Sequence, residues 1–139
     1  VDTNVLVYAF DTTAGVKQER ARALVERLFD EQRGLVSTQV LAELLVTLTR
    51  KVARPVPVKV AVEIVEDLAT WPVFAPAPTD LVAAALTAER YRVHFWDALV
   101  VRAAQCLDAQ VLWSEDLNPG QRYEGVEVRN PFLPTHDTV

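Results

Sequence analysis

Three acidic residues of this sequence each stand alone as the only charge in a long apolar stretch, and a fourth follows a short apolar run. They are Asp2, Glu43, Asp97 and Asp116. A buried carboxylate is costly unless it is paired, and several close together cannot all stay ionised without cations. A divalent ion with oxygen ligands, Mg²⁺ or Mn²⁺, meets that need. One or two such ions activate water and stabilise the reacting oxygens of a phosphodiester, so the acids point to phosphodiester hydrolysis.

A capping role is the alternative explanation for Asp97. This residue lies in the first turn of a predicted helix, where a carboxylate satisfies free backbone N–H groups and interacts favourably with the helix dipole. A cap explains one acid at a helix start, but it does not explain Asp2 and Glu43, each alone in apolar sequence. We therefore favour a shared metal site.

A phosphate substrate also needs cations, and basic residues flank two of the acids in the sequence. The candidate phosphate contacts follow the helix of Glu43 or precede Asp97: Arg50, Lys51, Arg54, Arg90 and Arg92. Basic residues near helix C-termini are also common because they interact with the dipole, which is the alternative interpretation.

His94 and the three tryptophans receive structural roles in this interpretation. We expect His94 to be a loop or packing residue and not a catalytic base. Trp71, Trp96 and Trp113 each adjoin apolar sequence, so we expect them in the core and not as surfaces on which bases stack.

Hydrophobic periodicity predicts alternating helices and strands that would position these side chains. Helices are expected at residues 5–10, around 21–29, and at 38–51, 58–69, 78–91 and 96–107. Strands are expected just before Asp2 and at residues 35–37, 72–75, 111–114 and 126–128. Gly34 is expected to end the second helix. Arg102 places a charge on an otherwise apolar helix, and we assign it no role.

The predicted elements favour one fold class. Short, continuously apolar strands that alternate with helices are typical of an α/β domain with a mainly parallel sheet covered on both faces. In such sheets, ligands bind outside the carboxyl ends of the strands. Asp2 and Asp116 follow strands and Asp97 starts a helix, so all three reach that edge. Glu43 lies about one and a half turns into its helix and would point there from the side.

Composition limits the class of protein further. The 139 residues, half of them apolar, fit one domain over residues 1–139. A net charge of −5 argues against a protein that holds nucleic acid through overall basicity. A single cysteine excludes an internal disulfide and a cysteine-based metal cluster, which favours a cytoplasmic location. No apolar run approaches the ~20 residues of a membrane span.

The two ends of the chain lead to an expectation about the first strand and one about the C-terminal tail. The sequence starts at Val1, on an apolar residue and without methionine, so we expect part of the first strand to lie upstream of the numbered residues. The tail after about residue 133 is expected to be frayed. We find no internal repeat, linker or low-complexity segment between the ends.

Four segments of the chain resemble, in the right order, the signature segments of PIN-domain ribonucleases. These segments are Val1–Leu6, Thr38–Leu44, Trp96–Val101 and Leu112–Leu117. The nearest branch is the VapC toxins of type II toxin-antitoxin modules. The resemblance covers almost the whole chain, including the closing segment Val128–Phe132.

The resemblance implies specific roles for the acids. The four acids would hold Mg²⁺ or Mn²⁺ for endonucleolytic cleavage of RNA, and Asn4 and Ser114 would support the first and the last of them. Glu115 stands beside Asp116 and offers a second candidate, but the pattern favours Asp116.

The resemblance also implies a fold and partners. The family fold is a three-layer α/β/α sandwich with a mainly parallel central sheet, usually paired as a homodimer. The implied partner is a VapB-type antitoxin whose C-terminal segment blocks the site, often with a basic side chain in the acidic pocket. The expected function is therefore that of a growth-inhibiting ribonuclease toxin neutralised by an antitoxin.

Two other classes of function remain alternatives. The first is a non-catalytic binding module on the same fold, in which the acids are caps and the groove engages a protein partner. The second is a phosphoacceptor receiver domain, which also clusters acids at strand ends. That class needs adjacent acids near the first strand and a lysine late in the chain, yet no lysine follows Lys59.

Overall fold

The computed structural model describes residues 1–134, so the predicted frayed tail after about residue 133 lies almost wholly outside the described residues. The helices are α1 (Thr3–Phe10), α2 (Val16–Asp30), α3 (Thr38–Arg50), α4 (Val58–Leu68), α5 (Pro78–Tyr91) and α6 (Phe95–Cys106). The strands are β1 (Val36–Ser37), β2 (Val73–Phe74), β3 (Val111–Trp113), β4 (Arg122–Tyr123) and β5 (Val126–Arg129). The sequence predicted all of these elements except β4. Among the described helices, none has the length and apolar character needed to cross a membrane.

The strands form two small sheets in which most pairs are parallel. β1 pairs with β2 and β3 pairs with β5 in parallel, whereas β4 pairs with β5 antiparallel. The chain start links the sheets, because the Val1 nitrogen donates to Leu35 O at 3.2 Å and Asp2 N donates to Trp113 O at 2.9 Å. Asp2 therefore lies beside the carboxyl end of β3.

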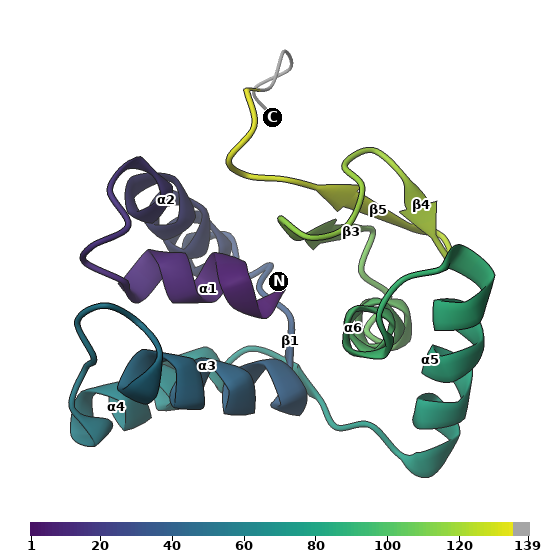
Figure 1. Ribbon diagram of the computed structural model, residues 1–139, viewed down its shortest axis with the longest axis horizontal. Helices are drawn as coiled ribbons and strands as arrows, with labels where there is room; N and C mark the ends of the chain where they lie inside the picture. Colours follow the sequence, from purple (N-terminus) through teal and green to yellow (C-terminus); the bar gives the residue numbers. More distant parts are fainter. Residues whose placement is uncertain (135–139) are drawn as a thin grey trace.

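Helices cover the strands on both sides. Figure 1 shows β1 between the α1–α2 pair and α6, the strands β3, β5 and β4 above α6 and α5, and α3 and α4 at the lower left. The buried core draws side chains from each layer, including Leu6 of α1, Leu44 of α3, Leu112 of β3 and Val128 of β5. The predicted α/β/α class with a mainly parallel sheet is confirmed.

Gly34 has a different role from the predicted helix stop. Helix α2 ends earlier, at Asp30, and Gln32 takes the left-handed conformation with φ of 54°. A Cβ at Gly34 would lie only 2.1 Å from Trp71 Cε2, so the backbone passes directly against the indole ring. The glycine is needed because it lets the chain enter β1 under a buried tryptophan.

Replacing Gly34 by alanine should destabilise the fold by about 3 kcal/mol, because the added methyl overpacks a ring that cannot shift freely. Trp71 is only 6% exposed and packs against Phe29 with ring centroids 4.8 Å apart. Urea denaturation of Gly34→Ala measures the cost. In a Trp71→Leu background the same methyl should cost far less, because the obstructing ring is gone. An equal cost in both backgrounds would contradict the proposed clash.

Arg102 acquires a structural role. Its Nε donates to Asp80 Oδ1 at 2.9 Å, which ties α6 to the first turn of α5. Asp80 Oδ2 also accepts a hydrogen bond from Ala77 N at 2.8 Å. Both interactions favour the charged carboxylate and lower the pKa of Asp80, with the Ala77 bond as the larger cause. The pair holds the α5–α6 unit together, and Asp97 lies on that unit.

Candidate functional site

Asp2 is held in one orientation by two hydrogen bonds. It is the N-cap of α1, where its Oδ1 accepts from Thr3 N at 2.7 Å, so the expectation that capping does not explain Asp2 is wrong for one of its two carboxylate oxygens. Its Oδ2 accepts from the hydroxyl of Ser114 at 2.8 Å. Asp2 is 5% exposed and Ser114 is fully buried, so this carboxylate is fixed deep in the fold.

Asp116 is positioned by the two residues that were predicted to support the acids. Asn4 Nδ2 donates to Asp116 Oδ2 at 2.8 Å. The backbone N–H of Asp116 donates to Ser114 Oγ at 3.2 Å, so one serine hydroxyl contacts both Asp2 and Asp116. The loop after β3 is thereby fastened to the start of α1.

The neighbouring acid Glu115 lies in a different environment. It forms an ion pair with Lys17 and accepts a hydrogen bond from the Tyr8 hydroxyl at 3.2 Å. Its charge is therefore matched by a cation from α2. Of the two adjacent acids, Asp116 is the one that lies with Asp2 and Asp97.

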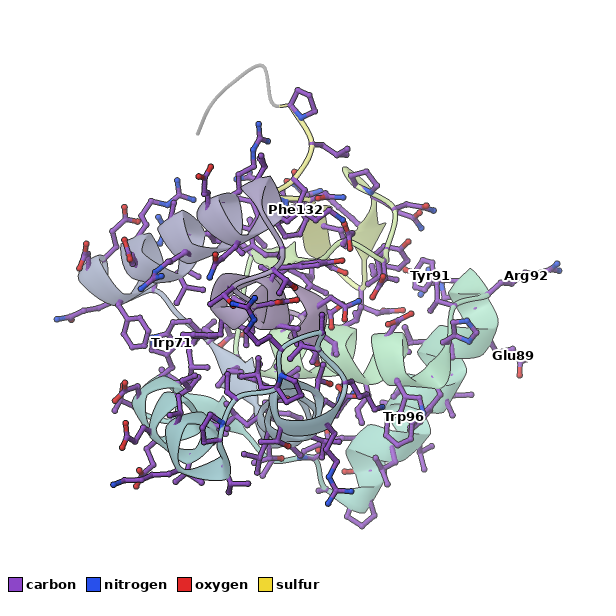
Figure 2. All side chains as sticks on the ribbon, turned by 60° about the vertical axis from the view of Figure 1, so that its left-hand side comes forward. Trp71, Glu89, Tyr91, Arg92, Trp96 and Phe132 are labelled. Carbon is purple, nitrogen blue, oxygen red and sulfur yellow. The ribbon has the colours of Figure 1, made fainter. Side chains whose placement is uncertain are left out.

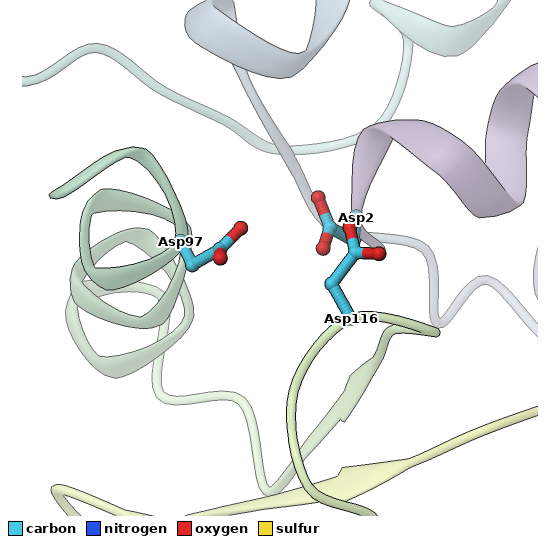
Figure 3. Close-up of side chains that lie close together, drawn as sticks. All are labelled: Asp2, Asp97 and Asp116. Carbon is cyan, nitrogen blue, oxygen red and sulfur yellow. The ribbon is translucent and has the colours of Figure 1, made fainter. Parts of the chain in front are cut away.

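Asp97 projects from the first turn of α6 toward the other two aspartates, as Figure 3 shows. Within residues 1–134 its carboxylate has no hydrogen-bond partner, and the N-cap of α6 is His94. A capping role therefore does not explain this acid. One carboxylate oxygen from each of Asp2, Asp97 and Asp116 can be chosen so that all lie within 4.8 Å of one another.

Glu43 lies next to this group without being part of it. It reaches the same pocket from α3, and its Oε1 accepts from Thr3 Oγ1 at 2.8 Å and from Gln39 Nε2 at 3.3 Å. The sequence interpretation did not identify Thr3 or Gln39. Gln39 could have been found from its spacing, because residues four apart share a helix face.

Crowding and burial disfavour the charged forms of the three aspartates. Burial, then the charges of Asp2 and Asp116, raise the pKa of Asp97 to about 6. The pKa of Asp2 is raised chiefly by burial, against the hydrogen bonds from Ser114 and Thr3. The pKa of Asp116 is raised by burial and by the charge of Asp2. The site therefore favours binding of protons or another cation.

The acids line a pocket of about 390 Å³ between the starts of α1 and α6 and one face of α3. Of the five predicted phosphate contacts, Lys51 lines this pocket. Arg90 instead pairs with Glu124 at 3.2 Å, and Arg92 is the left-handed C-cap of α5. Arg50 and Arg54 are exposed and do not contribute to the lining.

The prediction that all three tryptophans belong to the core is wrong for Trp96. Trp71 is buried, and Trp113 is half-buried beside Arg27, whose Cζ lies 5.9 Å from the centroid of its ring system. Trp96 is 60% exposed and lines the acidic pocket. The physical reason is position, because Trp96 lies in the first turn of α6, where the apolar helix emerges from the core.

Comparison with known proteins adds one match. A family model described as PIN domain matches residues 1–123. The matched region contains every residue that contributes to the pocket. No curated protein gives a significant match to the sequence.

Proposed function

Because the chain belongs to the PIN domain family, whose members are generally metal-dependent nucleases, we propose that it is an endoribonuclease dependent on Mg²⁺ or Mn²⁺. The convergence of Asp2, Asp97 and Asp116 on one pocket supports this proposal most directly. RNA is the proposed substrate, and the proposed reaction is hydrolysis of its phosphodiester bonds.

The donor set fits a hard divalent cation. Carboxylate oxygens without histidine or cysteine suit Mg²⁺ and Mn²⁺. Burial first, and then the neighbouring carboxylates, raise the pKa values of the aspartates, so a bound cation would offset their charges. When bound, the cation would activate water and stabilise the charge that develops on the phosphate.

The surrounding residues keep these donors in place. Ser114 and Thr3 hold Asp2, while Asn4 holds Asp116, so neither carboxylate needs to reorganise when a cation binds. This arrangement is the one expected of groups that orient metal ligands through hydrogen bonds. We propose that Asp2, Asp97 and Asp116 are metal ligands and that Asn4 and Ser114 support them.

We assign Glu43 to the same acidic quartet. Its charge contributes to the raised pKa values of Asp2 and Asp97, which means that the three carboxylates interact electrostatically. Thr3 connects it to Asp2, since the Thr3 hydroxyl donates to Glu43 and the Thr3 backbone N–H donates to Asp2. A cation held by the aspartates would therefore also attract the negative charge of Glu43.

The adjacent acids Asp116 and Glu115 provide a matched test of the site. Asp116→Asn should lower both Mn²⁺ affinity and RNA cleavage by about 100-fold or more. Mutation of a residue that only hydrogen-bonds to a metal ligand costs about 10- to 100-fold, and loss of the ligand itself should cost at least as much. Glu115→Gln should leave both nearly unchanged, because Glu115 is paired with Lys17. Calorimetric titration with Mn²⁺ and cleavage of end-labelled single-stranded RNA measure the two effects. Equal losses in both variants would contradict the assignment.

We further propose that the chain acts in the cytoplasm as a homodimeric growth-inhibiting toxin neutralised by a VapB-type antitoxin. Support comes from the VapC-like sequence segments and from the acidic pocket, which is suited to a basic side chain from an inhibitory peptide. The alternative function is that of a non-catalytic binding module. That function would be favoured if the protein bound no Mn²⁺ and still bound its protein partner.

A further inference from the structure

Trp96 is unusually placed for a large apolar side chain. It is 60% exposed, whereas Trp71 is 6% exposed. Figure 2 shows Trp96 on the same side of the molecule as Glu89 and Arg92, away from the buried Trp71. An exposed tryptophan beside the candidate cleavage site therefore needs an explanation that core packing does not provide.

The backbone at Trp96 is tied to the acidic site. Gln39 Nε2 donates both to Trp96 O at 3.4 Å and to Glu43 Oε1 at 3.3 Å. The indole also contacts Phe95 edge to face, with ring centroids 5.2 Å apart and an angle of 76° between the planes. These contacts hold the residue in position while most of its surface stays accessible.

The pocket offers little positive charge to a polyanion. Among the residues that the structure describes, the lining contains Asp2, Glu43, Asp97 and Asp116 but only one basic side chain, Lys51. Within residues 1–134, Lys51 forms no ion pair, so its charge is available. Stacking of a base on an aromatic ring does not depend on net charge, so it can supply affinity where phosphate contacts are few.

We propose that Trp96 is a nucleobase-stacking residue that positions one unpaired nucleotide of the RNA beside the aspartates, while Lys51 contacts its backbone. This proposal rests on the proposed function and requires that nucleotide to be unpaired, since both faces of a base inside a duplex are covered by the neighbouring bases. Val46 of α3, 46% exposed, adds apolar surface to the same pocket.

Lys51 lies farther along the pocket lining than Glu43. Glu43, Val46 and Lys51 lie on the same wall of the pocket, which α3 forms. Lys51 is the C-cap of α3 and follows Glu43 by eight positions, which corresponds to about 12 Å along the helix at a rise of about 1.5 Å per residue. A strand that extends from the aspartates along α3 would therefore pass Val46 before it reaches Lys51.

A contact between two copies of the chain is the competing use of Trp96. The neighbouring helix α5 exposes Leu81, Val82 and Leu86, which are apolar residues that a second copy could cover. None of these three lines the acidic pocket, whereas Trp96 does. Because Trp96 lines the acidic pocket, we favour RNA over a second copy of the chain as its binding partner.

The test combines a side-chain change with removal of single bases. Trp96→Leu should lower kcat/KM for single-stranded RNA by about 5- to 150-fold, mainly through KM, as expected for the loss of one stacked base. Trp96→Phe should retain most of the activity because it keeps an aromatic face. An RNA that is abasic at the stacked position should be cut by the wild type as poorly as intact RNA is cut by Trp96→Leu. The two changes together should cost no more than either alone.

Leu86→Ala is the matched control, because Leu86 is 65% exposed and lies outside the pocket. It should leave cleavage unchanged. If Leu86→Ala and Trp96→Leu both convert a dimer to a monomer in sedimentation analysis with equal losses of activity, Trp96 serves the interface and the stacking proposal is wrong. Equal cleavage of intact RNA by Trp96→Leu and the wild type would also overturn it, while leaving the nuclease function intact.

A binding measurement keeps the proposal testable without cleavage. Tryptophan fluorescence of the Asp116→Asn variant, in which one negative charge of the pocket is removed, should be quenched by single-stranded RNA, and the quenching should disappear when Trp96→Phe is added. If the wild type cuts no RNA, the proposed function fails, and this quenching still decides whether Trp96 stacks on a base. Unchanged quenching after Trp96→Phe would refute stacking at Trp96.

Discussion

Asp97→Asn should abolish RNA cleavage and, in the same protein, raise the stability of the metal-free fold. Activity should fall by at least about 100-fold, because a proposed metal ligand is lost. The gain in stability follows from the raised pKa of Asp97, which shows that the folded site disfavours its charge. Because Asp97 is partly exposed and solvent screens its charge, we expect a gain of only about 1 kcal/mol at pH 7.5. That gain corresponds to a rise in melting temperature of about 3–5 °C.

Thermal unfolding in EDTA and cleavage assays with Mn²⁺ measure the two effects of Asp97→Asn. Glu63→Gln, an exposed change on α4 outside the pocket, is the control that removes a charge without altering the site. Expression in cells extends the test to the proposed toxin role, since wild-type protein should arrest growth and Asp97→Asn should not. Growth arrest by the variant, or loss of stability on removing the charge, would contradict the proposed role of Asp97.

The second large effect is a dependence on pH. As the pH rises, the stability contribution of Asp97 in the metal-free protein should fall, whereas the affinity for Mn²⁺ should rise. An acid with a raised pKa in the folded state binds its proton more tightly there than in the unfolded chain. Its favourable contribution to stability is therefore complete below about pH 4 and is lost as the pH rises through about 6. The contribution of Asp97 to the stability of the metal-free protein thus falls between about pH 4 and 6, whereas the contribution of an aspartate with a lowered pKa rises with pH.

Metal binding should show the opposite trend, because Mn²⁺ needs the ionised carboxylates and competes with protons. Below pH 6, Mn²⁺ affinity and kcat/KM should each fall by about tenfold per pH unit, and more steeply if the aspartates titrate together. Melting temperatures with and without Mn²⁺ between pH 5 and 8 follow both trends. Cleavage that does not change over this range would show that Asp97 is not a site at which metal and protons compete.

Much of the candidate site could be predicted from residue types alone. A carboxylate that is the only charge in a long apolar stretch is expensive to bury, so Asp2, Glu43 and Asp97 stood out without any structural information. The alternation of apolar strands with helices likewise predicted an α/β domain with a mainly parallel sheet covered on both faces. Both inferences depend on local patterns along the chain, which is why the sequence could reveal them.

Other features depend on contacts between segments that are distant in the sequence. Arg102 had no predicted role, because its partner Asp80 lies on another helix. Gly34 was predicted to be a helix stop because the Trp71 ring that lies against it is distant in the sequence. The strand β4 is only two residues long and was missed because it has too few residues to show a periodic pattern.

The sequence by itself indicated that acids gather near the carboxyl edge of a mainly parallel sheet, and of these acids only Asp2 is buried in the described residues. Only the tertiary structure decided which acids meet, since Asp116 faces Asp2 and Asp97 whereas adjacent Glu115 is matched by Lys17. Only the structure showed that Trp96 is exposed beside those acids. The physical reason is that burial and pairing depend on distances between side chains of different elements, whereas sequence patterns report the preferences of each element alone.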